Sequence, residues 1–200
     1  MSESSPKLPR DPLNHAFALP RLDRAHYQGD AVVHWMLTIY DRATGWLTPE
    51  FHFRFRELMF HAAAREGLVC PAYCLMPDHM HLIWMGLRLD TDQLNGMAFL
   101  RTHLEPALSR ARFQPQAHDH VLREDERKRN AFAKVCFYIT ANSVRAGLVK
   151  EGQAWPFAGC VVPGYPNLDI FEDSYWSKFW KIHGRTRQLD SGWIKRPSIR

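Results

Sequence analysis

The sequence lacks a long apolar run, a secretory leader and a disulfide pattern. No stretch approaches the ~18 apolar residues of a membrane-spanning helix, and the first residues, MSESSPKLPRDP, contain no apolar leader core. The four cysteines are too few for a disulfide framework in a chain of 200 residues: Cys70, Cys74, Cys136 and Cys160. We therefore expect buried, reduced thiols, a cytoplasmic location and no membrane partner.

The sequence also has little excess of one charge. It carries 26 Lys and Arg against 21 Asp and Glu, a formal net charge of +5, with an ordinary hydrophobic content of 46%. The bases gather at the end, because residues 181–200 hold six Lys or Arg against one acid, Asp190, with Trp193 among them. Cations interleaved with aromatic residues suit nucleic acid. A solvated tail explains the same composition, so both interpretations stay open.

The order of the expected elements predicts the fold class. We expect a surface arm at 1–25, a strand at 31–40, a helix at 49–66 ended by Gly67, and a hairpin at 71–86. Helices at 91–111 and 124–146 enclose an extended segment at 113–122, and a short helix at 174–181 follows. This order predicts an α+β domain over 26–160: a ferredoxin-like antiparallel sheet with helices packed on one face. Residues 161–200 form an aromatic and basic extension.

The hairpin PAYCLMPDHMHLIWMG carries the first candidate site. Along a strand the side chains alternate faces, so His79 and His81 point to one side and Met80, Leu82 and Trp84 to the other. We expect both imidazoles on the solvent side of the strand, where they could fill two adjacent positions around a metal ion. A pair of strand histidines at a sheet edge is the alternative. A metal site needs a third ligand from elsewhere.

The helix at 124–146 offers that ligand. Its apolar stripe, which includes Phe132 and Ile139, should face the sheet. A polar stripe lies beside it: Lys134, Tyr138, Asn142 and Arg145. The phenolate could attack a phosphodiester, the amide oxygen could bind a hard metal ion, and the two cations could hold the phosphate. An amphipathic surface helix with a half-buried tyrosine is the alternative.

Two segments together resemble a known family. MPDHMHLIW at 76–84 is similar to the M-P-[DN]-H-x-H strand of the Y1 transposases, the HUH single-strand nucleases of the IS200/IS605 type. YITANSVRAGLV at 138–149 is similar to the Y-I-x-x-N-P-V-x-A-G-L-V helix of the branch associated with repetitive extragenic palindromes (REP). HDHVLRE at 118–124 and AWPFAGC at 154–160 also resemble flanking segments of that branch. The likeness runs from about Val32 to Cys160.

The resemblance implies a function and a set of site residues. His79 and His81 would be metal ligands for Mg²⁺ or Mn²⁺, Asn142 the third ligand, and Tyr138 the nucleophile that forms a 5′-phosphotyrosine with single-stranded DNA beside a hairpin. Ser143 departs from the family's proline and could relax Asn142. We expect DNA contacts from seven basic residues: Lys134, Arg145, Arg123, His120, Lys181, Arg185 and Arg187.

The expected protein is a monomer or homodimer associated with the nucleoid. Two rival functions stay open. One is a catalytically silent member of the same fold that binds DNA or RNA. The other is an unrelated metal-dependent hydrolase in which Tyr138 is structural. A covalent adduct between protein and DNA would separate the first interpretation from both.

Overall fold

The structure, a computed structural model, describes residues 20–128 and 130–193, without the side chains of residues 127, 128 and 187–193. Most of the expected arm at 1–25 therefore lies outside the described residues. The strands are β1 (Val32–Thr38), β2 (Leu68–Leu75), β3 (His79–Gly86), β4 (His118–Val121) and β5 (Ala158–Val161). The α-helices are α1 (Pro49–Glu66), α2 (Gln93–Leu104), α3 (Glu124–Lys128), α4 (Ala131–Arg145) and α5 (Tyr175–Trp193).

The five strands form one antiparallel sheet in the order β4-β1-β3-β2-β5. The first four strands follow the ferredoxin-like order, in which β1 and β3 are central. In the register of this central pair, Thr38 lies opposite His79 and Met36 opposite His81. The predicted α+β fold and antiparallel ferredoxin-like sheet are confirmed.

Helix α1 begins and ends at the predicted residues, and local interactions determine both ends. Thr48 caps the helix, since its hydroxyl accepts the N–H of Phe51 at 3.1 Å, and Pro49 occupies the first helical position. Gly67 ends it in the left-handed conformation at φ 66°. The apolar stripe of α1 is buried at Phe51, Phe55, Leu58 and Met59, so this helix is fastened to the sheet along its length.

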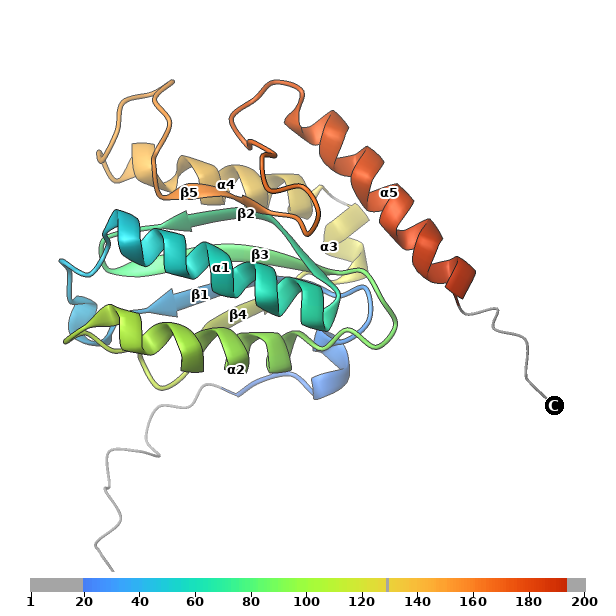
Figure 1. Ribbon diagram of the computed structural model, residues 1–200, viewed down its shortest axis with the longest axis horizontal. Helices are drawn as coiled ribbons and strands as arrows, with labels where there is room; N and C mark the ends of the chain where they lie inside the picture. The colour runs from blue at the N-terminus through green and yellow to red at the C-terminus, as the bar shows by residue number, and fades with distance from the viewer. Residues whose placement is uncertain (1–19, 129, 194–200) are drawn as a thin grey trace, which may run out of the picture.

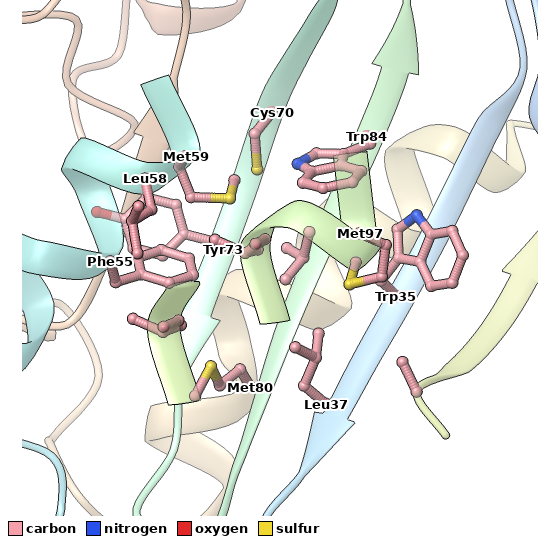
Figure 2. Close-up of a cluster of buried hydrophobic side chains, with 14 of the residues drawn as sticks. Trp35, Leu37, Phe55, Leu58, Met59, Cys70, Tyr73, Met80, Trp84 and Met97 are labelled. Carbon is pink, nitrogen blue, oxygen red and sulfur yellow. The ribbon is translucent and has the colours of Figure 1, made fainter. Parts of the chain in front are cut away.

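The first core lies between the sheet and the α1–α2 layer (Figure 1). Trp35 of β1 and Trp84 of β3 meet edge to face, with ring centroids 6.4 Å apart. Figure 2 shows their side chains with Tyr73 of β2 and Met97 of α2 among the cluster. Met80, Leu82 and Trp84 are buried in this core, which confirms the prediction that they point to the same side of β3. The neighbouring histidines of β3 must then face the other side of the sheet.

That other face is covered by α4, so the expectation that helices pack on one face holds for α1 and α2 but not for α4. Cys136 and Ile139 of α4 pack in a second core with Val69 of β2 and with Ile83 and Met85 of β3. β2 is buried at every position. A strand with both faces apolar requires cover on both sides. The helix that carries Tyr138 therefore lies over the face that carries the two histidines.

Two expected helices differ from the structure in their extent. The helix expected at 124–146 is two helices, α3 and α4, because Asn130 takes the left-handed conformation at φ 61° and breaks the chain direction. The helix expected at 91–111 ends at Leu104, and Pro106 lies in the 3₁₀ turn Glu105–Leu108 that follows. The extended segment expected at 113–122 contains the four-residue β4.

The segment after α4 contains more structure than we expected. β5 pairs with β2 in a stretch where no strand was expected. The short helix expected at 174–181 is α5, which begins at Tyr175 and continues to Trp193. Tyr175, Phe179 and Ile182 of α5 are buried in the second core, and Figure 1 shows α5 at the edge of the molecule beyond α4. Among the described residues, no helix combines the length and apolarity needed to cross a membrane.

Candidate active site

Two imidazoles of β3 converge at the centre of the site. Nε2 of His79 and Nε2 of His81 lie 3.0 Å apart. Two ligands at right angles around an ion, each about 2.1 Å away, have donor atoms about 3 Å apart. The two nitrogens therefore already have the spacing of adjacent ligands in an octahedral site.

A carboxylate orients His79 from the opposite side of its ring. Nδ1 of His79 lies 2.6 Å from Oδ1 of Asp78, and Arg42 donates to Oδ2 of Asp78 at 3.0 Å. Partial burial alone would raise the pKa of Asp78, but the hydrogen bonds from His79 and Arg42 outweigh it and the pKa is lowered. An ionised Asp78 keeps the proton of His79 on Nδ1, so the lone pair of Nε2 points toward His81.

A third histidine, His34, orients the ring of His81 through its Nδ1 atom. Nε2 of His34, on β1, lies 3.1 Å from Nδ1 of His81. Burial, followed by the nearby charge of His120, lowers the pKa of His34 to about 4. Burial, followed by His34 and His79, lowers the pKa of His81 to about 3. Both rings are therefore neutral at physiological pH, as metal ligation requires.

The burial of His81 corrects one expectation. We expected both imidazoles on the solvent side of β3, but only 2% of His81 is exposed, because α4 and the ring of His34 cover it. The side chain of His79 is 17% exposed. The pair is thus open to solvent and substrate from the side of His79.

Tyr138 of α4 lies against this pair. Its ring centroid is 5.4 Å from that of His81 and 6.1 Å from that of His34, in edge-to-face geometry. The guanidinium of Arg145 lies 5.2 Å from the same ring. Tyr138 is 37% exposed. The phenol therefore reaches solvent between two neutral imidazoles and one permanent cation, a setting in which it can attack an anionic phosphate.

Asn142 lies one turn after Tyr138 and is 8% exposed. Its Nδ2 donates to the carbonyl oxygen of Tyr138 at 2.9 Å, which leaves the amide oxygen as the atom available to a cation. Ser143 is buried in the last full turn of α4, and its carbonyl accepts the N–H of Leu148 at 2.9 Å. That bond spans five residues and belongs to the end of the helix, where Gly147 takes the left-handed conformation at φ 69°. Because α4 runs on to Arg145, the serine produces no break next to Asn142.

Two observations fit a divalent metal ion at this site, and the first is the 3.0 Å spacing of the two Nε2 atoms. The described residues contain no group of three His, Cys, Asp or Glu side chains that could hold a metal, so an ion on the histidine pair would need an amide, a phosphate oxygen or water as a further ligand. The hydroxyl of Thr38, buried opposite His79 on the same face, has no hydrogen-bond partner among the described residues. A buried hydroxyl without a partner is costly, and a hydrated ion beside His79 would provide one.

The residues near the site that we expected to contact DNA have different surroundings. Arg145 and Lys134 are exposed on α4, and Arg145 lies beside Tyr138. His120 of β4 is also exposed, but Nε2 of His120 lies 3.1 Å from Glu126. The same carboxylate accepts the backbone N–H of Arg123 at 2.8 Å. Glu126 therefore places a carboxylate beside these two residues.

The remaining expected contacts belong to α5. Lys181 and Arg185 are exposed on this helix, away from its buried stripe, while the side chain of Arg187 lies outside what the structure describes. Phe132 of α4 packs against Trp176 and Trp180 of α5, with centroids 5.9 and 5.4 Å away. The helix is thus anchored beside α4, separate from the histidine pair.

Three residues of the site were not predicted from the sequence, although the sequence contains a signal for each of them. Asp78 directly precedes His79. His34 and Thr38 are the polar residues at inward-facing positions of an otherwise apolar strand, AVVHWMLT. A polar residue on the buried face of a strand needs a polar partner. This requirement could have indicated that His34 and Thr38 belong to a site.

Comparisons with known proteins agree with the fold. No family model matches the chain, and no curated protein matches it. Among solved structures, the chain is similar to a REP-associated tyrosine transposase bound to a REP hairpin, with a TM-score of 0.57 and 22% sequence identity. The match covers 71% of this chain and 82% of the other. This chain has the fold of a REP-associated tyrosine transposase. The resemblance noted in the sequence is therefore confirmed at the level of the fold.

Proposed function

We propose that the protein is a metal-dependent endonuclease and strand transferase that acts on single-stranded DNA beside a hairpin and uses Tyr138 as its nucleophile. The observation that supports this most strongly is the meeting of the convergent His79–His81 pair with the ring of Tyr138. A structural tyrosine would not need a pair of imidazoles whose Nε2 atoms converge beside its ring. The transposase of the same fold is bound to a DNA hairpin, which supports this class of substrate.

Each side chain then has a defined task. A Mg²⁺ or Mn²⁺ ion held by His79, His81 and the amide of Asn142 would offset the negative charge that builds on the phosphate in the transition state. Arg145 holds a phosphate oxygen near the ring of Tyr138. The phenol loses its proton to water and its oxygen bonds to phosphorus, while the bond from phosphorus to the 3′-oxygen breaks and that oxygen takes up a proton from water. The products are a 5′-phosphotyrosine and a strand with a 3′-hydroxyl, which can attack in reverse.

A covalent adduct tests this function. The protein is incubated with Mn²⁺ and labelled single-stranded hairpin oligonucleotides, and the products are separated under denaturing conditions. We expect a protein–DNA adduct that carries label placed 3′ of the cut. Tyr138→Phe removes one oxygen and little volume, so this variant should fold and bind DNA but form no adduct. Tyr165→Phe is the matched control, because Tyr165 is similarly exposed, at 42%, and should leave the adduct unchanged.

Two outcomes would contradict the proposal in different ways. Cleavage that survives in Tyr138→Phe would mean that water or another side chain attacks, and the metal-dependent hydrolase would then be favoured. DNA binding without any adduct, across a varied oligonucleotide pool and with both metals, would favour the catalytically silent binder.

A further inference from the structure

Two loops meet on the side of the metal-site histidines away from Tyr138. The turn Tyr40–Arg42 follows β1, and the segment 109–112 precedes β4. The N–H of Tyr40 donates to the carbonyl of Arg112 at 2.8 Å, and the guanidinium of Arg112 lies 4.2 Å from the centroid of the Tyr40 ring. The backbone N–H of Ile39 donates to the carbonyl of Asp78 at 3.1 Å. The stacked pair is thus attached directly to the edge of the candidate site.

This surface is basic, aromatic and exposed. It consists of Tyr40, Arg42, Arg110 and Arg112, which we call the Tyr40 surface. Tyr40 is 41% exposed and all three arginines are exposed. Arg42 connects the surface to the site, because it binds Asp78 while 56% of its side chain faces solvent. Aromatic and guanidinium planes beside positive charge are the features that bind unpaired nucleotides.

Backbone strain is concentrated in the same two loops. Among the described residues, four that are not glycine have a positive φ, and three of them lie here: Asp41 at 53°, Arg42 at 54° and Ser109 at 59°. The left-handed conformation costs an ordinary residue about 1–2 kcal/mol. Such strain persists where the surrounding structure holds it in place, and it gathers at functional sites. Here it lies at Arg42 itself and at the residue directly before Arg110.

We propose that the Tyr40 surface binds an unpaired nucleotide of the DNA strand that flanks the cut. The base stacks on the outer face of the Arg112 guanidinium, which Tyr40 supports from below, and Arg42 and Arg110 bind the adjoining phosphates. The strand then extends from the ring of Tyr138, across His81 and His79, to the stacked pair. This inference rests on the proposed function for its substrate, but it concerns binding and can be tested without chemistry.

The test compares two probes in a protein that cannot cut. All variants carry Tyr138→Phe and are assayed in EDTA, by fluorescence anisotropy, against a DNA hairpin with oligothymidine arms and the same hairpin with blunt ends. Arg112→Lys keeps the charge but removes the plane. We expect it to bind the armed hairpin about tenfold more weakly and the blunt hairpin equally well. Arg65→Lys is the matched control, because Arg65 lies in the same way over Phe99, at 5.2 Å, on the α1–α2 side.

The opposite results are equally defined. Unchanged affinity for the armed hairpin, or an equal loss of affinity for both hairpins, would overturn the proposal. An equal loss would mean that Arg112 contributes to DNA binding without stacking on an unpaired base. Tyr40→Leu serves as the second variant, with folding checked by circular dichroism, and should reproduce the loss. Arms built of abasic nucleotides should abolish the wild-type preference for arms. Failure of Tyr138 to form an adduct would reject the proposed chemistry without changing any of these binding results.

Discussion

The two histidines of β3 differ in burial, and this difference changes what their removal should do. His79→Ala should abolish Mn²⁺ binding with little loss of stability, since its side chain lies at the open side of the site. His81→Ala should abolish Mn²⁺ binding and also lower the free energy of unfolding by about 1–3 kcal/mol, because it leaves a void and removes the partner of His34. Isothermal titration with Mn²⁺ and urea unfolding in EDTA measure the two effects.

His61→Ala is the matched control for this pair, because His61 is exposed on α1, on the opposite side of the sheet. It should change neither quantity. Mn²⁺ affinity that is undiminished in the double variant His79→Ala, His81→Ala would remove the metal site from its assigned place. Equal stability of the two single variants would mean that the contact between His81 and His34 contributes nothing to the fold.

For single residues, the sequence predicts those relations that involve residues close together along the chain. His79 and His81 share a face through strand alternation, and Tyr138 and Asn142 share one through helix periodicity, so both pairs could be found in advance. His34 could not be found in this way. It meets His81 only through the pairing of β1 with β3, and that register depends on contacts between segments almost fifty residues apart.

Among the elements, α1 was predicted to the residue because its start and end have local chemical causes: the Thr48 cap, Pro49 and Gly67. The division between α3 and α4 was missed, since asparagine in the left-handed conformation is a weak signal inside a charged, helix-favouring stretch. β5 was missed because AGCV has only four residues and gains its stability from pairing with β2. Elements that depend on tertiary partners are those that the sequence alone conceals.

A hydrogen-bonded cluster joins α1 to β2 and makes this junction sensitive to pH. Arg56 donates to the hydroxyl oxygen of Tyr73 at 2.7 Å, so that hydroxyl donates its own proton to Nε2 of His52, 2.8 Å away. The acceptor must be a neutral imidazole. Burial, followed by the charge of Arg56, lowers the pKa of His52 from 6.5 to about 4. Protonation of His52 would therefore remove this hydrogen bond and weaken the contact between α1 and β2.

The direction of the pH effect follows from that shift. The unfolded chain takes up the proton of His52 below its ordinary pKa of 6.5, whereas the folded chain takes it up only near 4. This contribution to stability is complete above pH 6.5, falls as the pH drops from 6.5 to 4, and changes no further below. Urea unfolding across that range should show a larger acid destabilisation for the wild type than for His52→Gln, whose amide accepts the same hydrogen bond without titrating. Parallel curves for the two proteins would contradict this role.

The whole molecule has a core on each face of one sheet, and this arrangement defines what α5 does. Tyr175, Phe179 and Ile182 complete the second core, where the hydroxyl of Tyr175 donates to the carbonyl of Pro71 at 2.5 Å. All three residues precede Gly184. Five Lys or Arg follow Gly184, with one acid, Asp190. The chain thus separates a structural first part of the extension from a basic second part, and truncation can remove one without the other.

A truncation after Gly184 tests the basic part. It leaves the buried stripe of α5 in place, so the free energy of unfolding should change by less than about 1 kcal/mol, because a helix end contributes little stability by itself. Hairpin DNA binding should weaken, and the plot of log Kobs against log salt should become flatter by about 0.7–0.9 for each phosphate that the shortened protein no longer neutralises. Anisotropy titrations at several salt concentrations measure this slope.

Charge removed elsewhere provides the control for this truncation. Arg54→Gln with Arg65→Gln removes two exposed cations from α1, across the sheet from the candidate site, and should leave the slope unchanged. A specific DNA surface at the end of α5 requires the truncated protein to differ from this control. Equal affinity and equal slope in the full-length and truncated proteins would mean that the basic residues after Gly184 form a solvated tail. The DNA contacts would then be made by residues that precede Arg185.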